Sequence, residues 1–243
     1  MIDLHCHILP GIDDGAASLD DAVAMARQAE QDGIEVVCAT PHIRHDHDVR
    51  IAELGRRVAE LNRELDRRGI AVRIAQGGEL SETTATELDP DELRSISLDR
   101  SGRWALLEPA PGPIGDSLGA TVRRLRGRGY RAVIAHPERH AGADLRERLA
   151  ALVRHGALIQ VTAAHLEEGA TAPALAELAQ IGLVHLVGSD SHSARAGRPV
   201  RLSGALEALA SVPHVAPHLD WIAREAPAAI LRGEDVEPPF GVS

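Results

Sequence analysis

The chain has 243 residues, of which 44 % are hydrophobic and only 2 % aromatic, so its core must be built from Ala, Val, Leu and Ile. Its formal net charge of −10 argues against a broad nucleic-acid-binding surface, because such surfaces are normally basic. Every basic residue is Arg, and the absence of Lys excludes a Walker-type phosphate loop and any Schiff-base lysine.

The sequence shows no targeting or membrane segment. No apolar run approaches the ~20 residues that a membrane span needs, and the N-terminus lacks the pattern of a secretory signal. Two cysteines, Cys6 and Cys38, do not suggest a disulfide framework. We therefore expect a cytoplasmic protein with no membrane span, and a single domain over residues 1–243. The sequence leaves the oligomeric state open.

Short apolar runs alternate along the chain with longer segments of helical periodicity. The runs predict seven strands, at Met1–Leu4, Glu35–Ala39, Val72–Gln76, Trp104–Leu107, Ala132–Ala135, Leu158–Val161 and Val184–Val187. The helical segments include Leu19–Asp32, Asp48–Arg68, Leu118–Arg128, Leu145–His155 and Ala172–Ile181. This alternation favours a mostly parallel sheet, and we predict an α/β barrel of seven strands. Pro109–Pro113 is predicted to be a loop, and Glu237–Ser243 a frayed tail.

The first strand ends in an unusual pair of histidines. Side chains alternate faces along a strand, so His5 and His7 point to one side and Cys6 to the other. Two imidazoles that project together form half of a metal site. Taken alone, the pair favours the simpler interpretation of two histidines that cap a strand.

The ends of the other strands favour the metal site. In a parallel β/α barrel, active-site residues lie at the carboxyl ends of the strands, and six of the seven predicted strand ends carry a His, Asp or Glu. The nine candidate ligands are His5, His7, Asp14, His42, Glu79, Glu108, His136, Asp190 and His192.

The number and type of these side chains indicate the chemistry. His and carboxylate ligands without thiolates suit Mn, Fe or Zn, and nine ligands are too many for one ion, so two or three divalent metals are expected. Two metals about 4 Å apart activate a water and stabilise both oxygens of an in-line phosphoryl displacement. A phosphoester hydrolase is therefore the leading prediction.

The motifs resemble those of the polymerase-and-histidinol-phosphatase (PHP) superfamily, and most closely its bacterial capsule-regulating branch, the manganese-dependent protein-tyrosine phosphatases. The resemblance is carried by residues 2–16, Ala39–His42, Ala135–Arg139 and Gly197–Pro199, together with the single acidic ligands and the Asp190-x-His192 pair. It implies a distorted seven-stranded barrel, a trinuclear manganese site, and Arg139 and Arg198 as the residues that hold the phosphate.

Two assignments depend on the resemblance. It favours Asp14 over Asp13 as a ligand, whereas residue chemistry alone leaves the choice open, since Asp13 could cap the turn. Arg139 and Arg198 suit phosphate in any case, because Arg is always charged and binds bidentately. Arg195 and Arg201 remain rivals of Arg198 in the same loop.

Three histidines depart from the pattern. His165 follows the sixth strand, where the branch usually has smaller polar residues, and is interpreted either as an additional group beside the site or as a surface residue. His45 and His47 follow His42 closely, and we interpret them as solvated loop residues that could shape substrate access.

One competing motif is rejected. Cys38 and Arg44 have the Cys-x5-Arg spacing of cysteine-dependent phosphatases. Such a loop needs backbone N–H groups around the anion, but here the intervening residues include no Gly, and Pro41 lacks an N–H. Cys38 also lies within an apolar strand, where a thiol is usually inert.

The resulting hypothesis is a metal-dependent phosphomonoesterase that removes phosphate from tyrosine in protein tails, with a metal-bridging hydroxide as nucleophile. The resemblance implies a bacterial tyrosine kinase as partner, in capsule or exopolysaccharide regulation. The alternatives are a histidinol-phosphate phosphatase, a nucleotide phosphoesterase and, from another class, a non-catalytic metal-binding regulatory domain. No nucleic-acid partner is expected.

Overall fold

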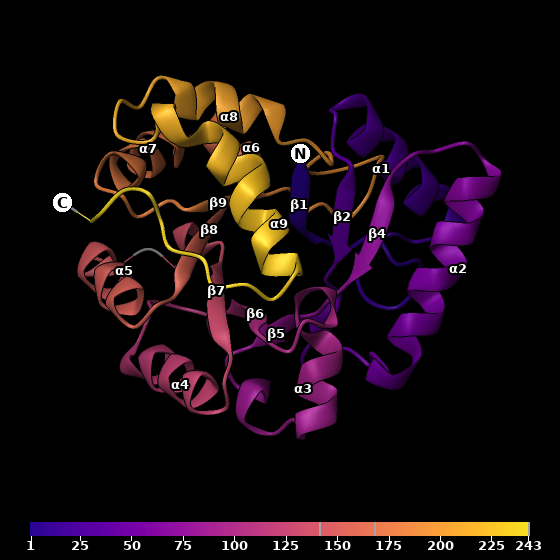
Figure 1. Cartoon of the computed structure of the whole chain (residues 1–243), viewed down its shortest axis with the longest axis horizontal. Coiled ribbons are helices and arrows are strands. Elements are labelled where there is room, and N and C mark those ends of the chain that lie inside the picture. Colours follow the sequence, from indigo (N-terminus) through magenta and orange to yellow (C-terminus); the bar gives the residue numbers. More distant parts are fainter. Residues whose placement is uncertain (141, 168, 243) are drawn as a thin grey trace.

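The structure, a computed structural model, describes residues 1–140, 142–167 and 169–242. Strands lie at the centre of the molecule and helices surround them (Figure 1). All strand pairs found among the described residues are parallel. Successive parallel strands need a crossover connection outside the sheet, so this arrangement confirms the predicted α/β class.

Nine strands occur in the described part of the chain, and they form two sheets, with the orders β1-β2-β4 and β3-β5-β6-β7-β8-β9. Each predicted strand has a counterpart, but the predicted count of seven is not confirmed, because β3 and β5 are additional. The strands are β1 (Ile2–Cys6), β2 (Val36–Ala39), β3 (His42–Ile43), β4 (Arg73–Gln76), β5 (Glu79–Ser81), β6 (Trp104–Glu108), β7 (Arg131–Ala135), β8 (Leu158–Thr162) and β9 (Leu186–Gly188).

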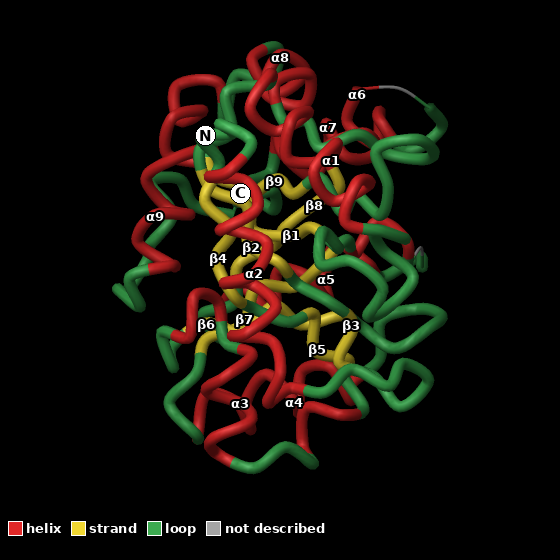
Figure 2. Tube along the Cα trace, turned by 90° about the vertical axis from the view of Figure 1, so that its right-hand side faces the viewer, coloured by secondary structure: helices red, strands yellow, loops and turns green. Residues whose placement is uncertain are grey.

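The two additional strands continue β2 and β4 beyond short breaks, and they lie side by side (Figure 2). Thr40 and Pro41 separate β2 from β3, and Pro41 has no N–H with which to continue the ladder. Gly77 and Gly78 separate β4 from β5; a Cβ on Gly77 would lie 2.9 Å from Cys38 Sγ. At both breaks the chain passes from the smaller sheet to the larger one.

The two sheets meet again where β1 lies beside β9. Cys6 and Ser191 form an isolated parallel bridge. The N–H of His7 donates to the Ser191 carbonyl over 2.9 Å, and the N–H of Asp190 donates to the His5 carbonyl over 2.8 Å. These bonds bring the carboxyl ends of the first and last strands together, although they are more than 180 residues apart.

The five predicted helices are all present and end within a few residues of the predicted bounds, except that α2 begins at Leu54 rather than Asp48. Ser18 starts the first helix by accepting a hydrogen bond from the Asp21 N–H. No helix among the described residues is both long and apolar enough to cross a membrane. The helices are α1 (Leu19–Gln31), α2 (Leu54–Arg67), α3 (Pro90–Ile96), α4 (Asp116–Gly127), α5 (Leu145–Arg154), α6 (Ala163–Glu167), α7 (Ala172–Gln180), α8 (Ser203–Ala210) and α9 (Ala226–Leu231).

The core is aliphatic, as the composition predicts, with Trp104 as its largest fully buried side chain. The predicted loop Pro109–Pro113 is confirmed between β6 and α4. The prediction of a frayed tail is wrong at Phe240, which is only 9 % exposed and packs against His185 and Trp221. Ser243 lies outside the described residues.

Candidate metal centre

The nine predicted ligands come together at the carboxyl ends of the strands. Among the described residues, four groups place candidate ligand atoms within 4.8 Å of one another, and together they contain all nine residues. These groups are His7, Asp14, His42 and His192; His5, His136 and Asp190; His5, His7 and Glu79; and His42, Glu79 and Glu108. Shared members make the groups one continuous cluster.

Glu79 is the centre of this cluster, at the start of β5. Its Oε1 lies 2.7 Å from His136 Nε2 and 3.3 Å from His5 Nε2. Its Oε2 lies 2.9 Å from His42 Nδ1 and 3.4 Å from His7 Nε2. Burial alone raises the pKa of Glu79, but the surrounding histidines outweigh burial and hold its pKa well below the usual value. Glu79 is therefore a buried carboxylate with four imidazole neighbours.

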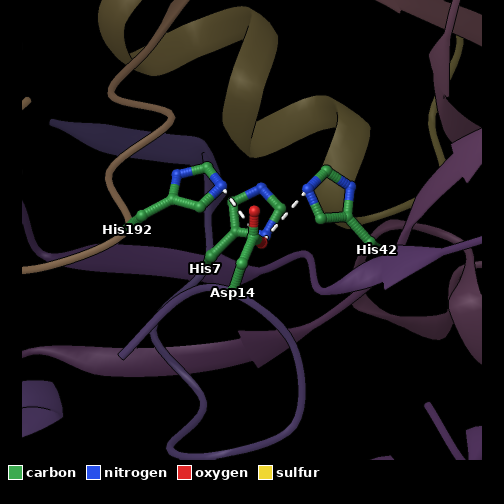
Figure 3. A group of neighbouring side chains, drawn as sticks. All are labelled: His7, Asp14, His42 and His192. Atoms are coloured by element: carbon green, nitrogen blue, oxygen red, sulfur yellow. Dashed lines mark ion pairs between the residues drawn. The ribbon is translucent and has the colours of Figure 1, made fainter. Parts of the chain in front are cut away.

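Asp14 joins three histidines at the outer edge of the cluster (Figure 3). Its Oδ1 lies 3.4 Å from His42 Nε2 and 3.5 Å from His192 Nε2. His7 stacks on His192 with 3.9 Å between ring centroids, and burial together with the charge of His7 lowers the pKa of His192 to about 3. Neutral imidazole is the form that binds metal.

Asp13 and Asp14 have different surroundings, which bears on the choice that residue chemistry left open. Asp13 Oδ2 lies 2.9 Å from His7 Nδ1 and accepts the His42 N–H, while its Oδ1 accepts the Gly15 N–H. Burial lowers the pKa of His7, but the hydrogen bonds of Asp13 and Glu79 outweigh burial and raise it to about 9. Asp13 thus orients a ligand and closes a turn, which leaves Asp14 as the carboxylate free to bind an ion.

His5 is held by groups that the sequence analysis missed. Its Nδ1 donates to Gln160 Oε1 over 3.0 Å, which turns Nε2 toward the cluster. Behind it, buried Asp3 accepts hydrogen bonds from the His5 N–H and from the N–H and hydroxyl of Ser189. The signal in the sequence was a Gln within the apolar run Leu158–Val161, and the structure shows that this Gln is fully buried. Partners of this kind fix the orientation of metal-binding histidines.

Two of the predicted ligands have a strained backbone. His136 has φ 31° and Asp190 has φ 47°, both in the left-handed region that non-glycine residues rarely adopt. His136 directly follows β7, and Asp190 lies two residues after the end of β9, so both turns lie at the carboxyl end of the strands. Strain of this kind concentrates at functional sites, where the surroundings enforce it.

The donor set fits divalent metals. Three buried ligand atoms, His42 Nδ1, Glu79 Oε2 and His136 Nδ1, have no hydrogen-bond partner among the described residues. His42 Nδ1 and Glu79 Oε2 lie only 2.9 Å apart, but their orientation does not make a hydrogen bond. Buried polar atoms need a partner, and an ion bound between imidazole and carboxylate groups would supply one for both atoms.

Arg139 and Arg198 reach the same edge of the cluster from two different loops. Both guanidinium groups pair with Asp190 Oδ2, Arg198 at 3.0 Å, and Arg198 also donates to the Asp190 carbonyl. The rivals of Arg198 point elsewhere: Arg195 is exposed, and Arg201 pairs with Glu167. The geometry therefore supports Arg198 as the second phosphate-binding candidate.

The loop after β3 borders the cluster. Arg44 lies 3.3 Å from Glu108 Oε2 and also pairs with Asp46. His47 stacks on His42 with 4.8 Å between ring centroids, whereas His45 is exposed and pairs with Glu87. His45 is solvated as predicted, whereas that prediction is wrong for His47, which is half-buried and stacks on a predicted ligand.

The cysteines take no part in the cluster. Cys38 is fully buried in the smaller sheet, and burial raises its pKa to about 12. Arg44 is turned to Asp46 and Glu108, so the two residues of the Cys-x5-Arg spacing do not form an anion site. Cys6 is fully buried as well, with its pKa well above the usual value because of burial. Neither thiol has the electropositive, accessible surroundings of a reactive cysteine.

Comparison with known proteins matches most of the chain to one family and to proteins named tyrosine-protein phosphatases. The profile of one family, capsular polysaccharide synthesis, CpsB/CapC, matches residues 1–231. The tyrosine-protein phosphatase YwqE of Bacillus subtilis is 33 % identical over 204 residues, which are 80 % of this chain and 78 % of YwqE. The tyrosine-protein phosphatase CpsB of Streptococcus pneumoniae is 27 % identical over 206 residues, which are 79 % of this chain and 83 % of CpsB.

Solved structures give the same picture. A chain from the crystal structures of YwqE from Bacillus subtilis and CpsB from Streptococcus pneumoniae, described as unique metal-dependent tyrosine phosphatases, superposes with a TM-score of 0.85 at 29 % identity and covers 100 % of this chain and 99 % of that one. A TatD-family hydrolase from Entamoeba histolytica has a TM-score of 0.55 at 11 % identity, which shows a shared fold alone.

Proposed function

The chain belongs to the CpsB/CapC family of capsular polysaccharide synthesis, and we propose that it is a metal-dependent phosphatase that removes phosphate from tyrosine residues of proteins. The observation that supports this most is the position of two arginines beside a cluster of nine His and carboxylate side chains. Such a cluster suits divalent metals, and Arg suits the phosphate. A purely regulatory metal-binding domain would not need the arginine pair.

The predicted ligands would hold two or three divalent ions, with manganese as the leading candidate and Fe or Zn as alternatives. Glu79 would hold the ions at the centre of the cluster, because its two oxygens face different histidines. When bound, the ions lower the pKa of a coordinated water and supply hydroxide near neutral pH. Asp13 and Gln160 keep His7 and His5 turned toward the centre.

The arginines position the substrate. Arg139 and Arg198 would bind the non-bridging phosphate oxygens with their N–H groups, in place of the bonds that they now make to Asp190. Phosphorus would then lie between the ligand cluster and the open end of the strands, with the ester oxygen directed outward. Displacement in line transfers the phosphoryl group to water in one step, without a phospho-enzyme intermediate.

Fold, compartment and partner follow from the same proposal. We take the nine strands as a distorted seven-stranded barrel of the PHP fold in which two strands are broken, formed by a single domain over residues 1–243. The free thiols Cys6 and Cys38 support the cytoplasm as its compartment. Because relatives are named tyrosine-protein phosphatases in a family of capsular polysaccharide synthesis, the proposed partner is the phosphotyrosine tail of a bacterial tyrosine kinase.

A substrate comparison tests the proposal. The purified protein, loaded with Mn²⁺, is assayed on a phosphotyrosine peptide, on histidinol phosphate and on short oligonucleotides. We expect hydrolysis of the peptide and little turnover of the others. No activity on the peptide, together with strong activity on either of the others, would overturn the assignment, and a trapped phosphocysteine or phosphohistidine would overturn the one-step mechanism.

A further inference from the structure

A buried carboxylate lies directly behind the arginine pair. Glu138 precedes Arg139 in the chain, and its side chain is only 4 % exposed. Its Oε1 accepts the Thr162 N–H over 2.9 Å and lies 3.2 Å from His165 Nδ1. Its Oε2 is buried without a hydrogen-bond partner among the described residues. Burying a carboxylate oxygen without a partner costs free energy. Glu138 is not one of the nine predicted ligands, and the proposed reaction gives it no role that would account for this cost.

His165 completes the pair from α6. Its Nδ1 faces Glu138, so its Nε2 is on the opposite edge of the ring. The side chain is 31 % exposed, close to the 33 % of Arg139 and the 29 % of Arg198. Nε2 makes no hydrogen bond within the described residues and is not among their buried unpartnered atoms. A carboxylate thus fixes one edge of an imidazole while the other edge stays open to solvent.

The strand order places His165 between the two arginines. Strands β7, β8 and β9 are neighbours in that order. Arg139 follows β7, Arg198 lies in the loop after β9, and His165 lies in the short helix that follows β8. All three strands are parallel, so the three side chains start from the same end of the sheet. His165 thus starts from the strand that lies between those of the two arginines, at the edge where a phosphate held by both would present its ester oxygen.

We propose that His165 is a further catalytic residue, which donates a proton from Nε2 to the phenolate that leaves phosphotyrosine, and that Glu138 is its positioning residue. This proposal rests on the proposed phosphatase function. As hydroxide forms its bond to phosphorus, the bond from phosphorus to the phenolic oxygen breaks, and that oxygen keeps the electron pair. The oxygen takes the Nε2 proton of the imidazolium form, which leaves a neutral imidazole with its hydrogen on Nδ1. Tyrosine leaves as the neutral phenol, and His165 regains its Nε2 proton from solvent.

The arrangement is that of a general acid oriented by a carboxylate. Tyrosine has a pKa of about 10, so its phenolate benefits from protonation as it leaves. A more acidic phenol leaves without help. The dependence of the rate on the leaving group therefore distinguishes a proton donor from a residue that only supports the fold.

The experiment compares His165→Ala with His155→Ala. His155 is also half-buried but precedes β8, at the opposite end of the same strand, so it is a matched control. Each metal-loaded protein is assayed with a phosphotyrosine peptide and with p-nitrophenyl phosphate, whose phenol is much more acidic than tyrosine. We expect His165→Ala to lower kcat/KM about 10²-fold or more on the peptide and less than about tenfold on the nitrophenyl ester. His155→Ala should change neither rate.

The outcomes separate the two proposals. Equal losses on both substrates, or no loss, with the wild type active, would overturn the role of His165 and leave the phosphatase function standing. A wild-type protein that hydrolyses neither phosphoester would overturn both proposals.

A second measurement tests the positioning role without any reaction. Nitrogen-15 NMR of the metal-free protein reports which nitrogen of His165 carries hydrogen. We expect hydrogen on Nδ1 in the wild type, directed to Glu138, and a changed His165 signal in Glu138→Gln, with the other histidine signals unmoved. Identical His165 signals in the two proteins would show that Glu138 does not hold the ring, and would overturn this half of the proposal.

Discussion

Two histidines at opposite ends of the strands, His7 and His185, are equally buried, at 1 % exposure each, but their pKa values shift in opposite directions. At the carboxyl end, hydrogen bonds from Asp13 and Glu79 outweigh burial and raise the pKa of His7 to about 9. At the amino end, burial alone lowers the pKa of His185 to about 4. Burial by itself therefore does not set the charge of a histidine here; the presence of a carboxylate partner does.

The partners of the two histidines explain what each end of the molecule does. His185 Nδ1 accepts the Ile159 N–H over 3.0 Å, and its ring stacks on Phe240 of the C-terminal tail. These neutral contacts close the amino end and serve stability. The carboxyl end instead collects buried carboxylates and imidazoles that fit a metal centre. Buried polar groups of this kind destabilise a fold unless each is paired, so their accumulation at the carboxyl end supports a functional site there.

The largest effect should come from the carboxylate at the centre of the functional end. Glu79→Gln removes the negative charge that four histidines share, so we expect loss of bound metal and a fall in phosphatase activity of about 10³-fold. Metal content measured by mass spectrometry, together with kinetics on a phosphotyrosine peptide, checks this. If Glu79→Gln keeps both its metal and its activity, the carboxyl end is not the metal centre, and the functional difference between the two ends is contradicted.

The arginine pair should come next in size. Arg139→Ala removes one of two guanidinium groups at the phosphate position, and we expect kcat/KM to fall about 10²-fold while metal content stays unchanged. Arg195→Ala, in an exposed position of the neighbouring loop, is the matched control and should remain within about twofold of wild type. Equal losses for both variants would mean that general surface charge, rather than a defined phosphate site, attracts the substrate.

The closed end should determine part of the pH dependence of stability. His185 has a pKa of about 4 in the folded protein and about 6.5 in the unfolded chain. The unfolded state therefore binds more protons between these values, and the free energy of unfolding decreases as the pH falls from 6.5 toward 4. Between pH 7 and pH 5 this residue alone contributes a loss of about 2 kcal/mol.

Urea unfolding at the two pH values tests this contribution. His185→Gln keeps an acceptor for the Ile159 N–H but does not titrate, so the loss between pH 7 and pH 5 should shrink by about 2 kcal/mol. His155→Gln, a half-buried control, should leave the wild-type dependence in place. An unchanged pH dependence in His185→Gln would show that His185 is not held neutral.

The smallest effect on activity is expected at the buried thiol of the competing motif. Cys38→Ala should leave kcat/KM within about twofold of wild type, because burial raises the pKa of Cys38 to about 12 and no anion-binding loop surrounds it. Stability should fall by about 1 kcal/mol through the lost packing. A loss of activity without a loss of metal would return the cysteine mechanism to consideration.

Much of the fold and of the candidate site could be predicted from the sequence. The apolar runs predicted every strand except the short β3 and β5. The rule that barrel sites lie at the carboxyl ends of strands selected nine residues, which the structure brings together. Both predictions depend on local sequence. The immediate neighbours of a residue determine which face of a strand its side chain is on, and whether it directly follows a strand.

Other features depended on contacts between distant segments. The pairing of Gln160 with His5, of Asp13 with the N–H of His42, and of Phe240 with His185 joins residues far apart in sequence. At the breaks around Pro41 and Gly77 the chain passes to the other sheet and forms the short strands β3 and β5. Strands of two or three residues are too short to show an apolar periodicity in the sequence. The sequence by itself determined which side chains are candidates to bind metal and phosphate. Only the tertiary structure decided which of them are neutral, charged or held in place, because burial and partners exist only after the chain has closed.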